Sequence, residues 1–212
     1  KLTMQTNSCK ICRRAGAKLF LKGDRCYQQK CAMVRRSYAP GKKGKRRTRS
    51  SSEYGIQLLQ KQKLKRFYNL REQQFKNYVK KVLAQKSEKA DLSGQLISIL
   101  ESRLDNTIFR LGFANSRPGA RQLVNHNNFL VNGKPVNIPS YQVKQNDIIA
   151  VAPGKAKNKY FTNLANSLKT HKTPSWLTLN ADKMEGKVSG AITIEEVEPI
   201  SDIGTIFEFY AR

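Results

Sequence analysis

The sequence predicts an α+β fold, in which a metal-bound N-terminal knuckle and a basic arm precede several helices and a small antiparallel sheet. Three observations support this prediction. Four cysteines lie within the first 31 residues, apolar residues recur at helical spacing between residues 54 and 124, and the turn pair Asn132-Gly133 separates two short apolar runs. Because 39% of the 212 residues are hydrophobic, the chain has enough apolar side chains to build packed cores.

The chain is strongly basic, with 40 Lys and Arg against 15 Asp and Glu and a net charge of +25. Sixteen of the basic residues and only one acid fall in residues 1–50, which favours a polyanion as partner. Residues 173–212 instead hold three basic residues and seven acids, which favours a basic protein neighbour. No apolar run has the length of a membrane span, and the first thirty residues lack the apolar core of a secretory signal. We therefore expect a cytoplasmic protein that does not enter a membrane.

The cysteines form the first element, with the pattern Cys9-x2-Cys12, thirteen intervening residues, and Cys26-x4-Cys31. Two such pairs bring four thiolates to one tetrahedral ion, so zinc is the predicted cofactor and its role is structural. An iron-sulfur cluster, a degenerate empty site and a pair of disulfides are the alternatives. The basic side chains of this segment are expected to face phosphate: Arg13, Arg14, Lys22, Arg25, Lys30, Arg35 and Arg36.

Residues 40–52, PGKKGKRRTRSSS, have no apolar period and read as an extended basic linker. Its predicted phosphate contacts are Lys42, Lys43, Lys45, Arg46, Arg47 and Arg49. Ser50 followed by Glu53 fits a capping box, so a helix is expected from about residue 51. Asn69 followed by Glu72 predicts the start of a second helix, whose apolar stripe runs from residue 75 to residue 83.

Three shorter helices and three strands are expected next. Apolar residues predict a helix around residues 96–100, another from Leu104 to a stop at Gly112, and a third that opens at Ser116 and Pro118 and runs to about His126. The expected strands cover residues 129–131, 134–138 and 147–151.

Arginines lie beside the apolar stripes of two of these helices. Arg103 and Arg110 are seven residues apart, as two helical turns require, and Arg117 and Arg121 are four apart on the next helix. We expect them to point away from the core and to contact a folded RNA backbone. The alternative is that they are merely solvated charges.

At this point the residues resemble a known family. Residues 104–151, LDNTIFRLGFANSRPGARQLVNHNNFLVNGKPVNIPSYQVKQNDIIAV, are similar to the RNA-binding module named after the fourth small-subunit ribosomal protein, with its RLDN, RxGFAxSRxxARQLVxH, VNG and IPSY motifs in order. The cysteine quartet, the EYGIQLLQKQKLKRFY helix and the closing FEFYAR resemble the zinc-binding, bacterial-type form of that ribosomal protein. The sequence departs from the family at Asn127-Asn128, where Gly-His is common, and at Lys144 to Asp147, which replace a Pro-Gly-Asp turn.

The resemblance implies a structural constituent of the small ribosomal subunit. Such a protein binds the 5′ domain of the subunit's RNA at a five-way junction, nucleates assembly, lines the path by which messenger RNA enters, contributes to translational accuracy and contacts the fifth small-subunit protein. The implied RNA-facing positions are Arg103, Arg110, Ser116, Arg117, Arg121, Gln122, His126 and Lys134. Glu195, Glu196, Glu198 and Asp202 are the acids expected to meet the neighbouring protein.

The resemblance also implies a discontinuous helical domain. The expected division is a knuckle and arm over residues 1–45, a mainly helical domain over 46–100 and 170–212, and the inserted RNA-binding module over 101–169.

The sequence argues against two other function classes. An RNA-modification factor that carries the same module is the first alternative, but the remaining segments are too short for a catalytic domain of about 150 residues. The two histidines, His126 and His171, also lack a nearby nucleophile and carboxylate. A nonspecific DNA-condensing protein would not need these amphipathic helices or an acidic C-terminal segment. We therefore expect a protein that is not an enzyme.

Overall fold

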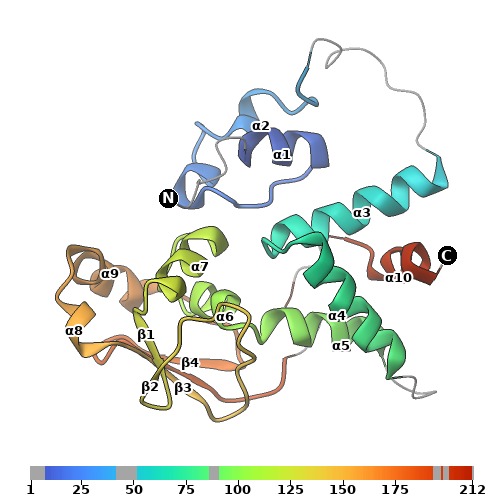
Figure 1. The fold of residues 1–212 in the computed structure, drawn as a ribbon. Helices are drawn as coiled ribbons and strands as arrows, with labels where there is room; N and C mark the ends of the chain where they lie inside the picture. The colour runs from blue at the N-terminus through green and yellow to red at the C-terminus, as the bar shows by residue number, and fades with distance from the viewer. Residues whose placement is uncertain (1–7, 42–51, 86–90, 193–196, 198–200, 212) are drawn as a thin grey trace. The chain divides into compact units, whose positions relative to one another are not determined.

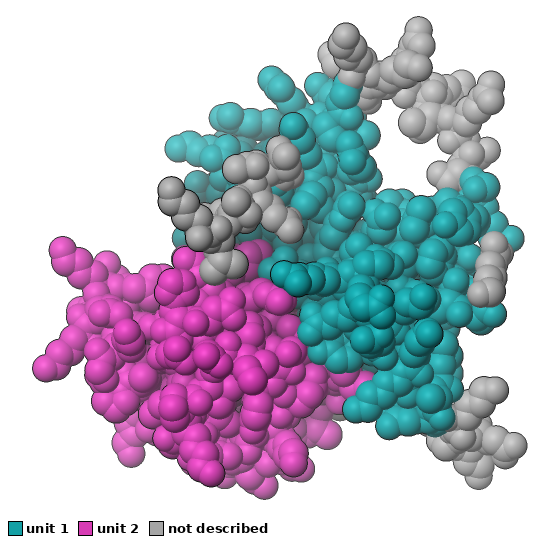
Figure 2. All heavy atoms as spheres, viewed as in Figure 1, with its two compact units in different colours: residues 1–96, 198–212 teal, residues 97–197 magenta. Residues whose placement is uncertain are grey.

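The computed structural model describes residues 8–41, 52–85, 91–192, 197 and 201–211, and the chain forms two compact units. Unit 1 comprises residues 1–96 and 198–212, and unit 2 comprises residues 97–197 (Figure 2). The chain therefore leaves unit 1, builds unit 2 and returns. Within the described residues no helix is long and apolar enough to cross a membrane.

The cysteine-rich segment of unit 1 folds into three short helical pieces. These are α1 (Ser8–Ala15), the 3-10 helix η1 (Gly23–Cys26) and α2 (Ala32–Arg35), drawn in blue in Figure 1. Leu19 and Leu21 are buried between them, and α1 packs against α2. Few apolar residues are buried here, as expected for a segment too small for a core of its own.

The rest of unit 1 is helical. It contains α3 (Glu53–Phe67), α4 (Glu72–Ala84), the first half of α5 (Leu92–Glu101) and α10 (Ile203–Ala211). The C-terminal α10 packs against both α3 and α4, although well over a hundred residues separate it from them (Figure 1). Ile206 of α10 and Phe75, Val79 and Val82 of α4 are fully buried, so this long-range packing closes a hydrophobic core.

The ends of α3 differ from the predicted ones. The predicted cap Ser50 lies outside the described residues, and the structure uses Ser52, whose hydroxyl oxygen accepts a hydrogen bond from the Gly55 amide (3.3 Å). The prediction that Asn69 caps the N-terminus of α4 is wrong, because Arg71 occupies that place. Asn69 instead ends α3 in the left-handed region at φ +53°, while the Leu70 amide donates to the Lys65 carbonyl (2.9 Å). Asn tolerates this conformation better than most residues, which explains its position.

Unit 2 combines helices with a five-stranded antiparallel sheet. The helices are α6 (Leu104–Arg110) and α7 (Arg117–Asn125), which pack against each other. The strands are β1 (Phe129–Val131), β2 (Lys134–Pro135), β3 (Ile148–Val151), β4 (Leu177–Asn180) and β5 (Glu185–Val188), in the order β2-β1-β3-β5-β4. Two further helices, α8 (Pro153–Ala156) and α9 (Lys159–Thr170), connect β3 to β4.

The predicted mixture of helices and a small antiparallel sheet is confirmed, with two corrections to the sheet. The sequence analysis placed residues 170–212 wholly in the helical domain, but β4 and β5 join the sheet of unit 2 through the pairing of β5 with β3. The strand expected over residues 134–138 is also shorter. The chain turns away after Pro135, because the Tyr141 and Pro139 carbonyls accept hydrogen bonds from the first amides of α6, those of Leu104 (2.8 Å) and Asp105 (3.2 Å).

The local turn predictions for unit 2 hold. Gly112 ends α6 at φ +83°, and its amide and that of Phe113 donate to the last turn of the helix. Asn127 ends α7 at φ +54° in the same way, so it fulfils the conformational role of the more common glycine. Asn132 (φ +49°) and Gly133 (φ +78°) form the predicted hairpin turn, in which Val131 pairs with Lys134.

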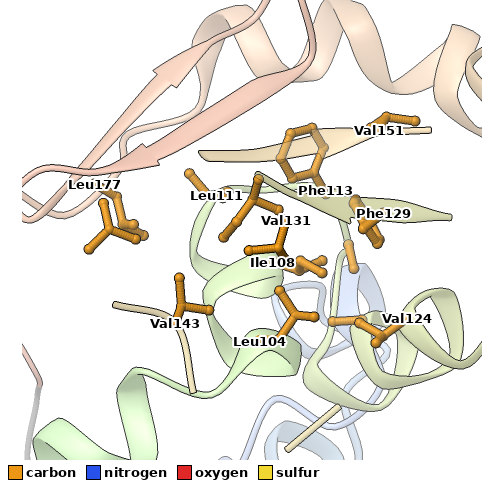
Figure 3. Close-up of a cluster of buried hydrophobic side chains, with 14 of the residues drawn as sticks. Leu104, Ile108, Leu111, Phe113, Val124, Phe129, Val131, Val143, Val151 and Leu177 are labelled. Carbon is orange, nitrogen blue, oxygen red and sulfur yellow. The ribbon is translucent and has the colours of Figure 1, made fainter. Parts of the chain in front are cut away.

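One continuous core joins α6 and α7 to the sheet. Leu104 and Ile108 of α6 and Leu111, the residue after it, point toward apolar residues of β1 and β3, as Figure 3 shows. Gly186 of β5 is required by this packing, since a Cβ atom there would lie 2.4 Å from a Leu111 methyl carbon. The core therefore fixes α6 on the sheet and sets the position of every side chain that α6 carries.

Candidate nucleic-acid interface

Glu101 organises the charged residues of unit 2. It is fully buried at the end of α5, and Arg110 of α6 donates two parallel hydrogen bonds to its carboxylate, each 2.9 Å long. Asn106 donates to the same carboxylate (2.6 Å). Burying a carboxylate without partners is costly, so these donors are what permits Glu101 to be ionised in the interior.

A second buried pair joins Arg103 to Asp105. The Arg103 guanidinium, fully buried, donates to both carboxylate oxygens of Asp105 at 3.0 and 2.7 Å. Arg121 of α7 lies 3.7 Å from the same carboxylate. Asp105 therefore lies next to arginines from the start of α6 and from α7.

Arg117 of α7 joins the cluster around Glu101. Its guanidinium donates to the Asn106 side chain (2.7 Å), lies 3.9 Å from Glu101 and stacks 4.6 Å above the ring of Phe109. Only 6% of Arg117 is exposed. Cation-π contact and hydrogen bonds together hold its planar head in one orientation.

These positions correct the expectation that the arginines point away from the core. Arg103 and Arg117 are buried and brace α6 against α7, so their side chains do not reach the surface. Arg110 and Arg121 are partly exposed, at 23% and 27% of their side-chain area, and can be reached by a ligand. Four arginines against two carboxylates leave a positive excess next to this exposed edge.

The remaining predicted contacts on α7 and the hairpin lie at the surface. Ser116 is half-buried and caps α7, because its hydroxyl oxygen accepts a hydrogen bond from the Gly119 amide (3.3 Å). Gln122, His126 and Lys134 are exposed. Ser116 therefore opens α7 as predicted and has a structural task there, whereas the other three present polar atoms to solvent.

Sequence reasoning missed two sets of residues. The carboxylates Glu101 and Asp105 were not recognised as anchors, although two acids among so many arginines were a usable signal. Exposed lysines around α8 and the start of α9 were not named either, although that segment has no acid: Lys155, Lys157 and Lys159. They extend the positive charge of unit 2.

His171 has a structural role at the end of α6. Its Nε2 lies 2.9 Å from the Arg110 carbonyl oxygen, and its ring covers Gly112 so closely that a Cβ atom there would lie 2.7 Å from it. The contact ties the loop after α9 to the end of α6.

In unit 1 the predicted arginines of the knuckle differ in how they are held. Arg13 donates to the Tyr38 carbonyl (2.9 Å) and lies 5.0 Å above the ring of the same residue. Arg14, Arg35 and Arg36 are exposed. The linker residues Lys42, Lys43, Lys45, Arg46, Arg47 and Arg49 and the acids Glu195, Glu196 and Glu198 lie outside the described residues.

The four cysteines are free thiols that influence one another. Burial raises the pKa of Cys12 and of Cys26, and the neighbouring cysteines raise both further. The Lys22 amide donates a hydrogen bond to the Cys26 sulfur (3.4 Å), as backbone amides do toward thiolate ligands. Nevertheless, within the described part of the chain no three His, Cys, Asp or Glu side chains are grouped so that they could hold a metal ion. The donor set is suited to zinc, but its arrangement here is not.

Comparison with known proteins gives a consistent result over the whole chain. Residues 3–101 match the family described as Ribosomal protein S4/S9 N-terminal domain, and residues 102–149 match the S4 domain. The chain is 46% identical to Small ribosomal subunit protein uS4 of Syntrophus aciditrophicus, with 97% of each chain covered. It is 47% identical to the uS4 protein of Thermotoga maritima, with 96% of each covered, and 46% identical to uS4A of Clostridium botulinum, with 97% of each covered.

Proposed function

Because this chain belongs to the uS4 family of small-subunit ribosomal proteins, we propose that it is a structural constituent of the small ribosomal subunit and that it binds the subunit's RNA. The observation that carries the proposal is the pair of partly exposed arginines, Arg110 and Arg121, held on two helices by buried carboxylates. Arginines fixed in this way recognise one arrangement of phosphates rather than any polyanion.

The mode of binding follows from what surrounds these arginines. Exposed polar residues of α7 and lysines of α8 and α9 lie in the same unit, and the two acids next to these arginines, Glu101 and Asp105, are already engaged by them. Folded RNA is recognised mainly through its shape, its phosphates and its 2′-hydroxyl groups, which such a surface suits. The role requires no catalytic residue.

The finer proposal concerns where the protein binds. We infer that its RNA site is the five-way junction in the 5′ domain, that binding there nucleates assembly, and that the basic arm lines the path by which messenger RNA enters. The family membership supports this assignment, together with the concentration of basic residues at the N-terminal end. A protein in this position would contribute to translational accuracy, and its location would be the ribosome.

The acidic C-terminal segment supports a protein partner. Residues 173–212 carry seven acids against three basic residues, and phosphate would repel them. We propose that Glu195, Glu196, Glu198 and Asp202 face the neighbouring fifth small-subunit protein. Reversing the charge of the three glutamates should then weaken assembly with that protein while RNA binding stays unchanged. Unchanged affinity and salt dependence for the protein would contradict the proposal.

A structural zinc ion is the remaining part of the proposal. The spacing of Cys9, Cys12, Cys26 and Cys31 supports it, as do their mutual electrostatic influence and the backbone hydrogen bond to the Cys26 sulfur. Since the described cysteines form no metal-binding group as they stand, zinc binding requires their side chains to turn toward a common centre. When bound, the ion would cross-link a segment that has little core of its own.

The function is tested by asking whether the protein co-sediments with small ribosomal subunits and protects the 5′ domain of their RNA from chemical cleavage. We expect both, and we expect Arg121→Ala to weaken protection. Much less than one copy of the protein per purified small subunit would contradict the structural role. Protection confined to another RNA domain would contradict only the proposed location.

A further inference from the structure

A pair of aromatic rings, one of them exposed, lies on the cysteine-rich knuckle of unit 1. The rings of Phe20 and Tyr27 are stacked, with centroids 5.0 Å apart and an angle of 29° between their planes. Tyr27 is 70% exposed, the most exposed of the large hydrophobic side chains in the described residues. Tyr27 is therefore largely open to solvent, more so than Val34 (56%) and Tyr38 (38%) of the same segment.

The backbone holds this pair in place. Leu19 and Leu21 are buried on either side of Phe20, and Phe20 itself has φ +50°, a left-handed conformation that is uncommon for a bulky residue. On the other side, the Tyr27 amide donates to the Asp24 carbonyl (3.1 Å), which closes η1. Such a conformation persists only where the surrounding structure fixes the residue, and here it holds the half-buried ring of Phe20 against the exposed ring of Tyr27.

The charge around the pair selects its ligand. Residues 18–30 contain one acid, Asp24, and four basic residues, all exposed: Lys18, Lys22, Arg25 and Lys30. An aromatic face flanked by cations is the arrangement that binds single-stranded nucleic acid, because bases stack on the ring while the phosphates meet the charges. A protein ligand of opposite charge would match the lysines but gives no reason for an exposed, stacked ring.

We propose that Tyr27, supported from behind by Phe20, is a stacking platform for an unpaired RNA base, with Lys22, Arg25 and Lys30 contacting the adjoining phosphates. The inference rests on the proposed RNA-binding function and deepens it, since it assigns a single-stranded contact to the knuckle in addition to the contacts of unit 2. Stacking accepts any base, so the platform contributes affinity and positions a single strand without selecting its sequence.

The test measures binding of the full-length protein to a uridine oligonucleotide of about 12 nucleotides, within the range of single-stranded site sizes, and to the same backbone without bases. Tyr27→Ala should lower affinity for the uridine strand by about 5- to 150-fold, the range that corresponds to about 1–3 kcal/mol per stacked base. Binding to the abasic strand should not change. Tyr27→Trp should keep wild-type affinity, and its fluorescence should be quenched by the uridine strand, because the single native Trp176 is buried in unit 2.

Two further variants separate stacking from stability. Tyr27→Leu keeps an apolar cover over Phe20 without an aromatic face, so it should lose affinity as Tyr27→Ala does, and it replaces that variant if the latter does not fold. Tyr54→Ala is the matched control, because Tyr54 is also exposed (52%) and contacts a phenylalanine, Phe209 at 5.6 Å. It should bind both strands as the wild type does.

Wild-type affinity of Tyr27→Leu for the uridine strand would overturn the platform. Equal losses on the uridine and abasic strands would overturn it as well, since a lost base contact changes only the first. Either result leaves the proposed function standing if the wild-type protein still protects small-subunit RNA. Failure of the wild-type protein to bind that RNA would contradict the proposed function instead.

Discussion

Arg110 and Glu101 form a bidentate ion pair, in which the Arg110 Nε and Nη2 atoms each lie 2.9 Å from one carboxylate oxygen of a fully buried glutamate. The arginine is partly exposed and the glutamate is not. The pair therefore ties a surface cation to the interior, and it explains how a basic helix can present an arginine in a fixed orientation rather than on a flexible stem.

Replacing Glu101 should destabilise unit 2. Glu101→Ala leaves Arg110 and Arg117 without their shared carboxylate, and breaking a buried ion pair from one side costs about 3–5 kcal/mol. Urea unfolding measures the change in the free energy of unfolding. The control is Asp182→Asn, which removes an exposed contact with Lys169 at 3.9 Å and should cost less than about 1 kcal/mol. Similar losses in both variants would show that Glu101 is not the anchor.

Arg117 and Arg121 should behave differently although they lie one turn apart. Arg121→Ala should weaken binding to the cognate RNA by about 1–3 kcal/mol with little effect on random RNA, because its side chain is accessible. Arg117→Ala should mainly lower the free energy of unfolding, since the residue is buried. Neutralising the linker lysines and arginines should lower the affinity for both RNAs and reduce the salt dependence of binding. If all three changes lowered the affinity for cognate RNA and for random RNA in the same ratio, the proposed difference between these residues would be wrong.

Gly186→Ala should destabilise the sheet of unit 2. Its Cβ atom would lie 2.4 Å from a Leu111 methyl carbon, so the Leu111 side chain must shift within the core, and overpacking of this kind costs about 1–3 kcal/mol. Thermal unfolding provides the measurement. Gly154→Ala is the control, because nothing lies within 4 Å of its added Cβ atom. A variant as stable as the wild type at position 186 would mean that Leu111 does not pack against Gly186 as described.

The packing of α10 should depend on pH through Glu72. Burial raises the pKa of Glu72, but hydrogen bonds from Lys61 (2.6 Å) and Lys65 (2.7 Å) outweigh burial and lower the pKa from 4.5 to about 2. A lowered folded-state pKa gives stability that is present above pH 4.5 and is lost as the pH falls toward 2. Unfolding curves across this range should show the loss in the wild type.

Glu72→Gln should remove this part of the pH dependence, and Lys65→Met should reduce it by removing one cause. Because the Glu72 side chain is 48% exposed, salt should also weaken the effect. The same carboxylate accepts a hydrogen bond from the Tyr210 hydroxyl (3.2 Å), so the change reports on the docking of α10. An unchanged slope in Glu72→Gln would contradict this account.

Zinc binding predicts about one equivalent of metal in protein purified without chelator. Since burial raises the pKa of Cys12 and Cys26, their thiols are protonated in the metal-free protein at neutral pH. Binding must then release protons, and the affinity should rise with pH. Elemental analysis gives the content, and Cys26→Ser should lower it. Less than about half an equivalent of zinc would contradict a closed four-thiolate site.

Local backbone chemistry is what the sequence predicted most reliably. Gly112, the Asn132-Gly133 turn and the Ser116 start of α7 were all predicted, because each depends on a few neighbouring residues and on a conformation or cap that few residue types favour. Asn69 was the exception. Asparagine suits both an N-cap and a left-handed helix end, so its residue type did not decide between them.

The tertiary structure alone decided which charges are buried. Helical spacing placed Arg117 beside an apolar stripe, but its burial depends on Asn106 and Glu101 lying opposite it once α5, α6 and α7 pack together. The membership of β4 and β5 in the sheet has the same origin, because β5 pairs with β3 across an intervening segment that contains α8 and α9. The sequence by itself therefore determined the family, the local turns and the excess of positive charge. Packing between distant segments decided which arginines stay at the surface, because a charge is buried only where another part of the chain supplies its partner.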